Sequence, residues 1–331
     1  MGAPDLFRPD GAAARRLAHQ LRRRLAGSFR HLLEACRGHL PLDETAVTIA
    51  IARIKCVARV RPDVFIIHRI CVEAARDGDL ETLAAAFRAF GEAPIAASRA
   101  MQVRNWGDHS FQPGEIDRFR WVFEDDSGLA FDPAPPHAFS RACRAVTAAL
   151  AVLDRADPEF RAEIDALVHE VVLAQAQDDA GMSFDGVTAF YAGGALVLNA
   201  AAHQTVPGAL AGIVHEAAHL LMLASGEGAD LVENAPEERY PSPLRQDRRP
   251  MNGVLHATVV SARIALALDR VLAAGALDGA DRAEAAALRA GSRRAFEAGL
   301  EVVRAHGRPT ALGRAFLEGA TAAMWLEPAL S

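Results

Sequence analysis

A helical spacing of apolar residues opens the chain. Between residues 11 and 37 an apolar side chain recurs every three or four positions, and the arginines fall mostly on the opposite face. The recurring apolar residues are Leu17, Leu21, Leu25, Phe29 and Leu32. This pattern predicts a surface helix whose arginine face is either solvated or a docking surface for an acidic peptide or partner.

Helical spacing continues as far as residue 105. The expected helices lie near 44–60 and after Pro62, Asp79 and Pro94. His68 lies in the apolar stretch VFIIHRICV, where we expect a packed core histidine rather than a ligand. The first third of the chain is therefore predicted to be all-helical.

Around residue 119 the pattern changes from helical spacing to alternation. Aromatic and polar residues alternate over 119–123, and the turn sequence Asp-Asp-Ser-Gly follows at 125–128, which together predict a β-hairpin. The run Asp-Pro-Ala-Pro-Pro at 132–136 then interrupts regular structure. We expect a mostly helical N-terminal region at 1–132 and a second domain at 133–331.

The second domain again shows mostly helical spacing. Helices are expected at 137–154, 158–178, 251–274, 279–306 and 309–327. His169 falls in the second of these, where we expect a structural role. The stretch 182–199 predicts two short strands around a Gly-Gly turn, after which Thr205 is suited to cap a helix and Gly226 to end it. The whole pattern predicts a mainly α fold with a small β component.

Composition narrows the classes of function. The net charge of −6 and the pI near 6.1 argue against a nucleic-acid-binding protein, whose surface would be basic. Four cysteines lie without CxxC spacing, which predicts reduced core thiols. We recognise no signal peptide and no apolar run of about 18–20 residues that would span a membrane. We therefore expect a soluble, cytoplasmic protein that binds neither nucleic acid nor membrane.

The strongest chemical signal is the sequence H-E-x-x-H at residues 215–219. On a helix, His215 and His219 stand on the same face one turn apart, so both imidazoles can reach one divalent metal ion. Glu216 lies beside them as a general base or as a hydrogen-bond partner. The alternative is an amphipathic helix with two buried, hydrogen-bonded histidines. The motif favours a metal site.

A metal held by protein side chains usually needs a third ligand. The sequence after His219 lacks the third histidine of the metzincins, and the glutamates that follow lie in a Pro- and Gly-rich loop without helical context. These glutamates are Glu227, Glu233, Glu237 and Glu238. His256 lies on an apolar stretch where a buried imidazole needs a partner, so it is our candidate third ligand, with a lone core histidine as the alternative. Three histidines suit Zn, Fe or Cu.

The loop before His256 concentrates positive charge. Arg245, Arg248 and Arg249 lie within five positions on a proline-stiffened segment. Guanidinium groups bind carboxylates through two parallel hydrogen bonds, so these arginines are candidates for holding a dicarboxylate co-substrate beside a metal. The alternative is a solvated basic loop that pairs with Glu237 and Glu238.

The two motifs together resemble one family. H-E-x-x-H followed by P-x-R-x-D-x-R-P-x-x-G-x-L-H is similar to the HExxH-type 2-oxoglutarate-dependent peptide β-hydroxylases, which modify ribosomally made peptides. The matching residues are His215, Glu216, His219, Pro243, Arg245, Asp247, Arg249, Pro250, Gly253, Leu255 and His256. The resemblance covers roughly residues 195–265, and Leu244 stands where many relatives carry Trp.

The resemblance implies a zincin-like metal-binding core and an Fe(II) ion held by His215, His219 and His256. It also implies that 2-oxoglutarate chelates the iron, with its distal carboxylate held by an arginine. Arg245 is the first choice for this arginine, Arg249 the second, and Arg248 lies between them. The implied reaction is β-hydroxylation of a side chain in a precursor peptide, with Glu216 orienting a ligand or an iron-bound water.

Two further interpretations stay open from the sequence. The first is a zinc metallopeptidase, in which Glu216 activates a zinc-bound water as a general base. The second is a non-catalytic scaffold that binds peptides. Under each interpretation, two roles stay open for the N-terminal helices: binding a leader peptide or binding the second subunit of a homodimer.

Overall fold

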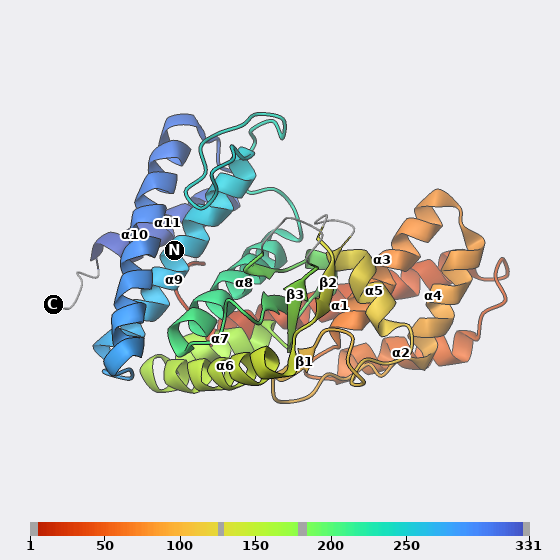
Figure 1. Ribbon diagram of the computed structural model, residues 1–331. Helices are drawn as coiled ribbons and strands as arrows, with labels where there is room; N and C mark the ends of the chain where they lie inside the picture. Colours follow the sequence, from red (N-terminus) through yellow and green to blue (C-terminus); the bar gives the residue numbers. More distant parts are fainter. Residues whose placement is uncertain (1–5, 125–128, 178–183, 327–331) are drawn as a thin grey trace. The chain divides into compact units, whose positions relative to one another are not determined.

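The computed structural model describes residues 6–124, 129–177 and 184–326 (Figure 1). About 64% of the chain is helical and 9% is in strands, which confirms the predicted mainly α fold with a small β component. The chain divides into two compact units, and each combines separate parts of the sequence. Each unit is described below by itself.

The first unit contains the H-E-x-x-H sequence and is called the histidine unit. It consists of Met1–Ala12, Pro136–Ile164 and Ala200–Ser331. The second, called the sheet unit, consists of Ala13–Pro135 and Asp165–Asn199. One boundary between the units falls between Pro135 and Pro136, inside the proline-rich run at 132–136. Residues 165–199, which follow that run, nevertheless belong with the N-terminal helices.

The histidine unit is built from long helices. They are α6 (Pro136–Ala156), the first residues of α7 (Pro158–Leu167), α8 (Val206–Gly226), α9 (Met251–Ala273), α10 (Gly279–His306) and α11 (Ala311–Leu326). Helix α9 packs against α6, α8, α10 and α11, and Figure 1 shows α9 and α10 side by side in cyan and blue. Most of its residues are buried, including Val260, Ala265 and Leu268. Helix α9 is therefore the centre of this unit.

Helices α8 and α9 are long and apolar enough to cross a membrane by length and composition. The expectation that no segment reaches this threshold is therefore wrong. Within the structure, 61% of the apolar window of α8 and 83% of that of α9 are buried. Such burial is what the core helices of a soluble protein show, because their apolar side chains face other helices.

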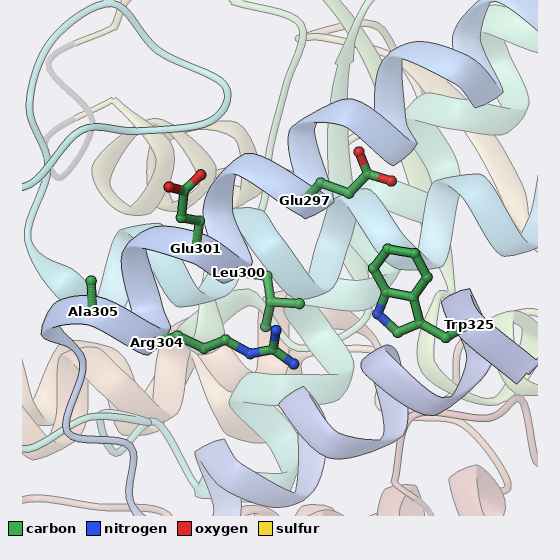
Figure 2. A pocket seen from close by; sticks show the side chains of 6 residues that line it. All are labelled: Glu297, Leu300, Glu301, Arg304, Ala305 and Trp325. Carbon is green, nitrogen blue, oxygen red and sulfur yellow. The ribbon is translucent and has the colours of Figure 1, made fainter.

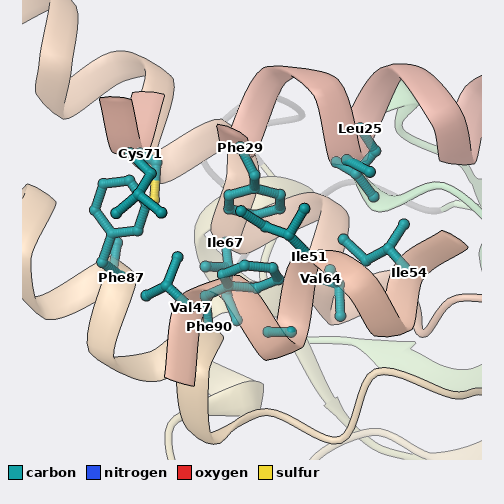
Figure 3. Packing of buried hydrophobic residues seen from close by; sticks show 14 of the residues in the cluster. Leu25, Phe29, Val47, Ile51, Ile54, Val64, Ile67, Cys71, Phe87 and Phe90 are labelled. Atoms are coloured by element: carbon teal, nitrogen blue, oxygen red, sulfur yellow. The ribbon is translucent and has the colours of Figure 1, made fainter. Parts of the chain in front are cut away.

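The described part of the sheet unit contains five α-helices, four of which share one apolar cluster, while the fifth packs in a second cluster with the strands. The helices are α1 (Gly11–Cys36, from Ala13 onwards), α2 (Glu44–Cys56), α3 (Pro62–Asp77), α4 (Leu80–Glu92) and α5 (Glu115–Phe123). Figure 3 shows the buried cluster formed by α1, α2, α3 and α4, in which the rings of Phe29 and Phe90 stack with their centroids 3.8 Å apart. His68 is half-buried, packs edge-on against Phe29 and has its Nε2 2.7 Å from Ser28 Oγ, so it is packed as expected, at the margin of the core.

Five strands form one mixed sheet in this unit. They are β1 (Gln102–Asn105), β2 (Phe131–Pro133), β3 (Glu170–Ala176), β4 (Gly186–Val187) and β5 (Ala195–Asn199). Strand β3 is central: it pairs in parallel with β1 and β5 and antiparallel with β2, while β4 pairs antiparallel with β5. The two strands expected within 182–199 are therefore confirmed as β4 and β5, in the described part of that stretch.

Three predicted elements differ from the structure. The hairpin predicted at 119–131 is wrong, because residues 119–123 belong to helix α5. Phe119 and Phe123 fit an alternating pattern but are also one helical turn apart, and both rings pack edge-on against Trp106. The turn at 125–128 lies outside the described residues. The helix at 158–178 ends at Leu167 and gives way to β3, whose first five residues are buried. The helix after Pro94 is absent, since Ala96 pairs with Val60 in a β-bridge and β1 follows at Gln102–Asn105. The prediction that the first third of the chain is all-helical is therefore wrong.

The prediction of core thiols is right for two cysteines. Cys36 and Cys71 are buried in the cluster of Figure 3, and burial raises the pKa of the Cys71 thiol to about 12. Cys56 is exposed at the end of α2 and Cys143 is half-buried, so neither is a core residue. All four are free thiols.

His169 fixes the turn before β5. It is buried, and its Nδ1 lies 2.9 Å from the Val60 carbonyl oxygen, which confirms a structural role. Gly194 has φ +94°, and a Cβ placed there would lie 2.7 Å from His169 Nδ1. A side chain at position 194 thus meets both an unfavourable backbone and an occupied space.

We expect Gly194→Ala to lower the free energy of unfolding by about 2–4 kcal/mol, from backbone strain plus overpacking. Gly27→Ala is the control, because Gly27 lies inside α1 and a Cβ added there would meet no other atom within 4 Å. That substitution should raise stability by up to about 1 kcal/mol through helix propensity. Urea unfolding of both variants measures the difference, and equal stabilities would contradict the prediction.

Candidate metal centre

Helix α8 positions the H-E-x-x-H residues. Thr205 caps the helix by accepting a hydrogen bond from Gly208 N, as expected, and Gly226 is its last residue, followed by Glu227 in the left-handed region with φ 56°. Most of α8 is buried, including Ile213 and Val214 immediately before the motif. The helix is therefore held rigidly at the point where the two histidines project.

His215 and His219 bring two ring nitrogens together. Their Nε2 atoms lie 3.3 Å apart, with ring centroids 5.0 Å apart and planes tilted by 56°. Two imidazole nitrogens bound to one tetrahedral ion at about 2.0–2.1 Å stand about 3.3 Å from each other. The spacing of this pair therefore fits two ligand positions of a single metal ion.

His256 approaches the pair from α9, as the sequence predicts, but on the other side of His219. Its Nδ1 lies 3.2 Å from Nδ1 of His219, and the two rings stack at 5.4 Å with planes 21° apart. His219 thus faces His215 with one nitrogen and His256 with the other. Among the described residues no three His, Cys, Asp or Glu side chains converge on one point in an arrangement suited to a metal ion.

Burial keeps the central imidazoles neutral. Desolvation lowers the pKa of His219 well below its usual value, and the neighbouring His215 and His256 lower it further. Burial likewise lowers the pKa of His256 to about 4, against a smaller opposite effect of Asp230. A neutral imidazole has a free lone pair on one nitrogen, which is the form that binds a metal ion. The cluster is therefore ready for a cation at neutral pH.

Glu216 is the most enclosed polar residue of the motif. Its side chain is almost fully buried, and Oε1 lies 3.9 Å from Nε2 of His215. At this distance the carboxylate can contact a group bound next to His215. Such a contact suits a general base and an orienting hydrogen-bond acceptor equally well. Its position alone does not choose between these roles.

The three candidate arginines are all exposed on the loop between α8 and α9. The loop is closed by paired hydrogen bonds between the Tyr240 and Arg249 backbones. Arg248 donates to the Arg239 carbonyl oxygen at 2.8 Å, and Arg249 pairs with Asp247 at 2.8 Å. Arg245 has no side-chain partner among the described residues. None of these three arginines forms an ion pair with Glu237 or Glu238 within the described part of the chain, so the alternative of such pairing is not supported.

Two of the glutamates after the motif have a defined place in the structure. Glu227 ends α8, and Glu238 accepts hydrogen bonds from Tyr240 and Asn234, which lower its pKa. These contacts occupy Glu238 within its own loop. Outside α8, His256 contacts His219 of the motif through Nδ1.

His203 is a buried residue beside α8 that the sequence reasoning missed. It lies in the segment before α8, and a Cβ added at Gly212 would overlap its ring. Gly212 precedes His215 by nearly one helical turn, so a histidine ring fills the space next to the motif. The glycine just before the H-E-x-x-H sequence was the available signal for a close neighbour.

A shallow cavity of about 560 Å³ lies elsewhere on the histidine unit. Figure 2 shows its lining on α10 and the end of α11: Glu297, Leu300, Glu301, Arg304, Ala305 and Trp325. None of the candidate site residues lines it. This cavity is therefore not part of the histidine cluster.

No protein-family model matches this sequence, and no curated protein matches it.

Proposed function

We propose that this protein is an Fe(II)- and 2-oxoglutarate-dependent enzyme that hydroxylates a side chain of a ribosomally made precursor peptide. The observation that carries the metal site is the convergence of the His215 and His219 Nε2 atoms at 3.3 Å. Both rings belong to a helix whose surroundings are apolar and buried. Fe(II), when bound with 2-oxoglutarate and O₂, supplies the oxidising chemistry that inserts oxygen into a C–H bond.

The exposed guanidinium of Arg245, on the loop that leads into α9, is available to bind a dicarboxylate co-substrate. Arg248 and Arg249 already have partners in their own loop, whereas Arg245 has none among the described side chains. A guanidinium that binds a carboxylate contributes two charge-assisted hydrogen bonds. Arg245 would hold the distal carboxylate of 2-oxoglutarate, and Glu216 would orient a water or a ligand beside His215.

The proposed setting is the cytoplasm, where a peptide precursor and reduced thiols coexist. Four free cysteines and two mostly buried apolar helices support a soluble protein in a reducing compartment. Incubation of the Fe(II)-loaded protein with 2-oxoglutarate, O₂ and a candidate precursor peptide should yield succinate and a peptide heavier by one oxygen atom. Absence of succinate under these conditions would contradict the proposal.

Arg245→Gln should raise the KM for 2-oxoglutarate by about 10–100-fold, the effect of losing charge-assisted hydrogen bonds of about 1.5–3 kcal/mol. Metal binding should be unchanged, because the substitution leaves the histidines intact. Arg248→Gln is the matched control and should change the KM little, since its guanidinium already binds the Arg239 carbonyl oxygen. Steady-state succinate formation measures both, and equal KM values in the two variants would exclude Arg245 as the anchor.

A zinc metallopeptidase is the second candidate, favoured by the buried Glu216 beside His215. In that case zinc would supply Lewis-acid chemistry and Glu216 would accept the proton of the attacking water, so Glu216→Gln should abolish activity. In the hydroxylase, the same substitution should lower activity less than loss of either histidine. Cleavage of a peptide bond by the zinc-loaded protein, without succinate formation, would decide for the peptidase.

A further inference from the structure

The two nitrogens of His219 have different neighbours. Nε2 lies 3.3 Å from His215 Nε2, whereas Nδ1 lies 3.2 Å from His256 Nδ1. The nitrogens of one imidazole point away from each other in the plane of the ring, so a single ion cannot sit between His219 and both neighbours. The ring of His219 therefore separates His256 from the place where the His215 and His219 nitrogens converge.

A hydrogen bond between His219 and His256 follows from this arrangement. A neutral imidazole carries its proton on one nitrogen and a lone pair on the other. If His219 offers the lone pair of Nε2 to an ion, its proton sits on Nδ1, where the nearest acceptor is Nδ1 of His256. The buried N–H is thereby satisfied, which it must be to avoid a desolvation penalty.

We propose that His256 is a positioning residue that fixes the tautomer and ring orientation of His219, and that it is not the third metal ligand. The inference rests on the proposed metal site at His215 and His219, but it does not depend on which reaction takes place there. Metal-binding histidines commonly donate their second N–H to a neighbouring acceptor. Here that acceptor is supplied by a histidine of α9, so the packing of α9 against α8 sets the orientation of His219.

The first test counts the imidazoles bound to the metal. Extended X-ray absorption fine structure of the zinc-loaded full-length protein should show two imidazoles, and the number should stay at two in His256→Gln. Three imidazoles in the wild type, falling to two in His256→Gln, would overturn the inference while leaving the metal site intact. A wild-type protein that binds no zinc would overturn the proposed metal site itself and the inference with it.

The second test uses the acceptor chemistry of position 256. Glutamine retains a side-chain oxygen that can accept from His219 Nδ1–H, so His256→Gln should weaken zinc binding by less than about 10-fold. Leucine removes the acceptor, and His256→Leu should weaken it by about 10–100-fold, the range for loss of a hydrogen-bond partner of a ligand. Equal losses in the two variants would contradict a positioning role.

Two controls separate this effect from a loss of structure. Thermal unfolding of the zinc-free variants shows whether either substitution disturbs the packing of α9, and only variants that unfold like the wild type enter the comparison of affinities. His306→Gln alters a histidine of the same unit that stacks on Tyr240 and is not one of the three clustered histidines, and it should leave zinc affinity unchanged. If His256→Leu unfolds early, the imidazole count in His256→Gln still decides between ligand and positioning residue.

Discussion

Replacing His219 by alanine is expected to remove metal binding and all turnover. His219 is the centre of the cluster: it contacts His215 through Nε2 and His256 through Nδ1, so its loss removes one ligand and isolates the other two histidines. Loss of a partner that only orients a ligand costs about 10–100-fold in affinity. Loss of the ligand itself should exceed that range, and His215→Ala should behave in the same way.

Equilibrium dialysis with Zn²⁺ and Fe(II) measures the expected loss, with succinate formation as the second readout. His137→Ala is the matched control, because His137 is an exposed histidine on α6 of the same unit. This variant should bind metal and turn over like the wild type. Wild-type metal affinity in His219→Ala would refute the metal centre, whichever reaction is assigned to it.

The helices of this fold were predictable where one face is apolar and the ends are marked. Helix α10 begins and ends where the spacing predicts it, and α9 differs from the expected span by one residue. The pattern failed where two periodicities coincide. Phe119 and Phe123 satisfy alternation and helical spacing alike, and only their joint packing on Trp106 decides for α5. Helix α7 stops because the apolar run from 170 onwards pairs with strands that are remote in sequence.

The candidate site likewise has features that the sequence predicts and features that depend on the folded structure. The His215–His219 pair is a local feature, since residues four apart on a helix lie together whatever the rest of the chain does. The approach of His256 could be anticipated from its apolar surroundings. Which nitrogen it meets could not, because that depends on the packing of α9 against α8. The partners of Arg248 and Arg249 were equally invisible, since they arise from the closure of their loop.

Arg263→Leu should cause the largest loss of stability among single substitutions in the histidine unit. Arg263 is buried in α9, where it pairs with the buried carboxylate of Glu163, donates to the Phe7 carbonyl oxygen at 2.5 Å and lies over the Phe160 ring. Removal of one member of a buried ion pair leaves an uncompensated charge and costs about 3–5 kcal/mol. The Arg263→Leu/Glu163→Leu double variant should recover much of this loss, since two apolar groups of similar volume replace the pair.

The pH dependence of the stability of Arg263→Leu tests whether the unpaired charge of Glu163 causes the loss. Burial raises the pKa of Glu163, and Arg263 opposes this shift. Without Arg263 the folded protein holds a proton on Glu163 that the unfolded chain releases, so stability falls as pH rises. The deficit of Arg263→Leu relative to wild type should therefore be larger at pH 8 than at pH 5. Urea unfolding at both values tests this, and a deficit independent of pH would point instead to the lost contact with Phe7.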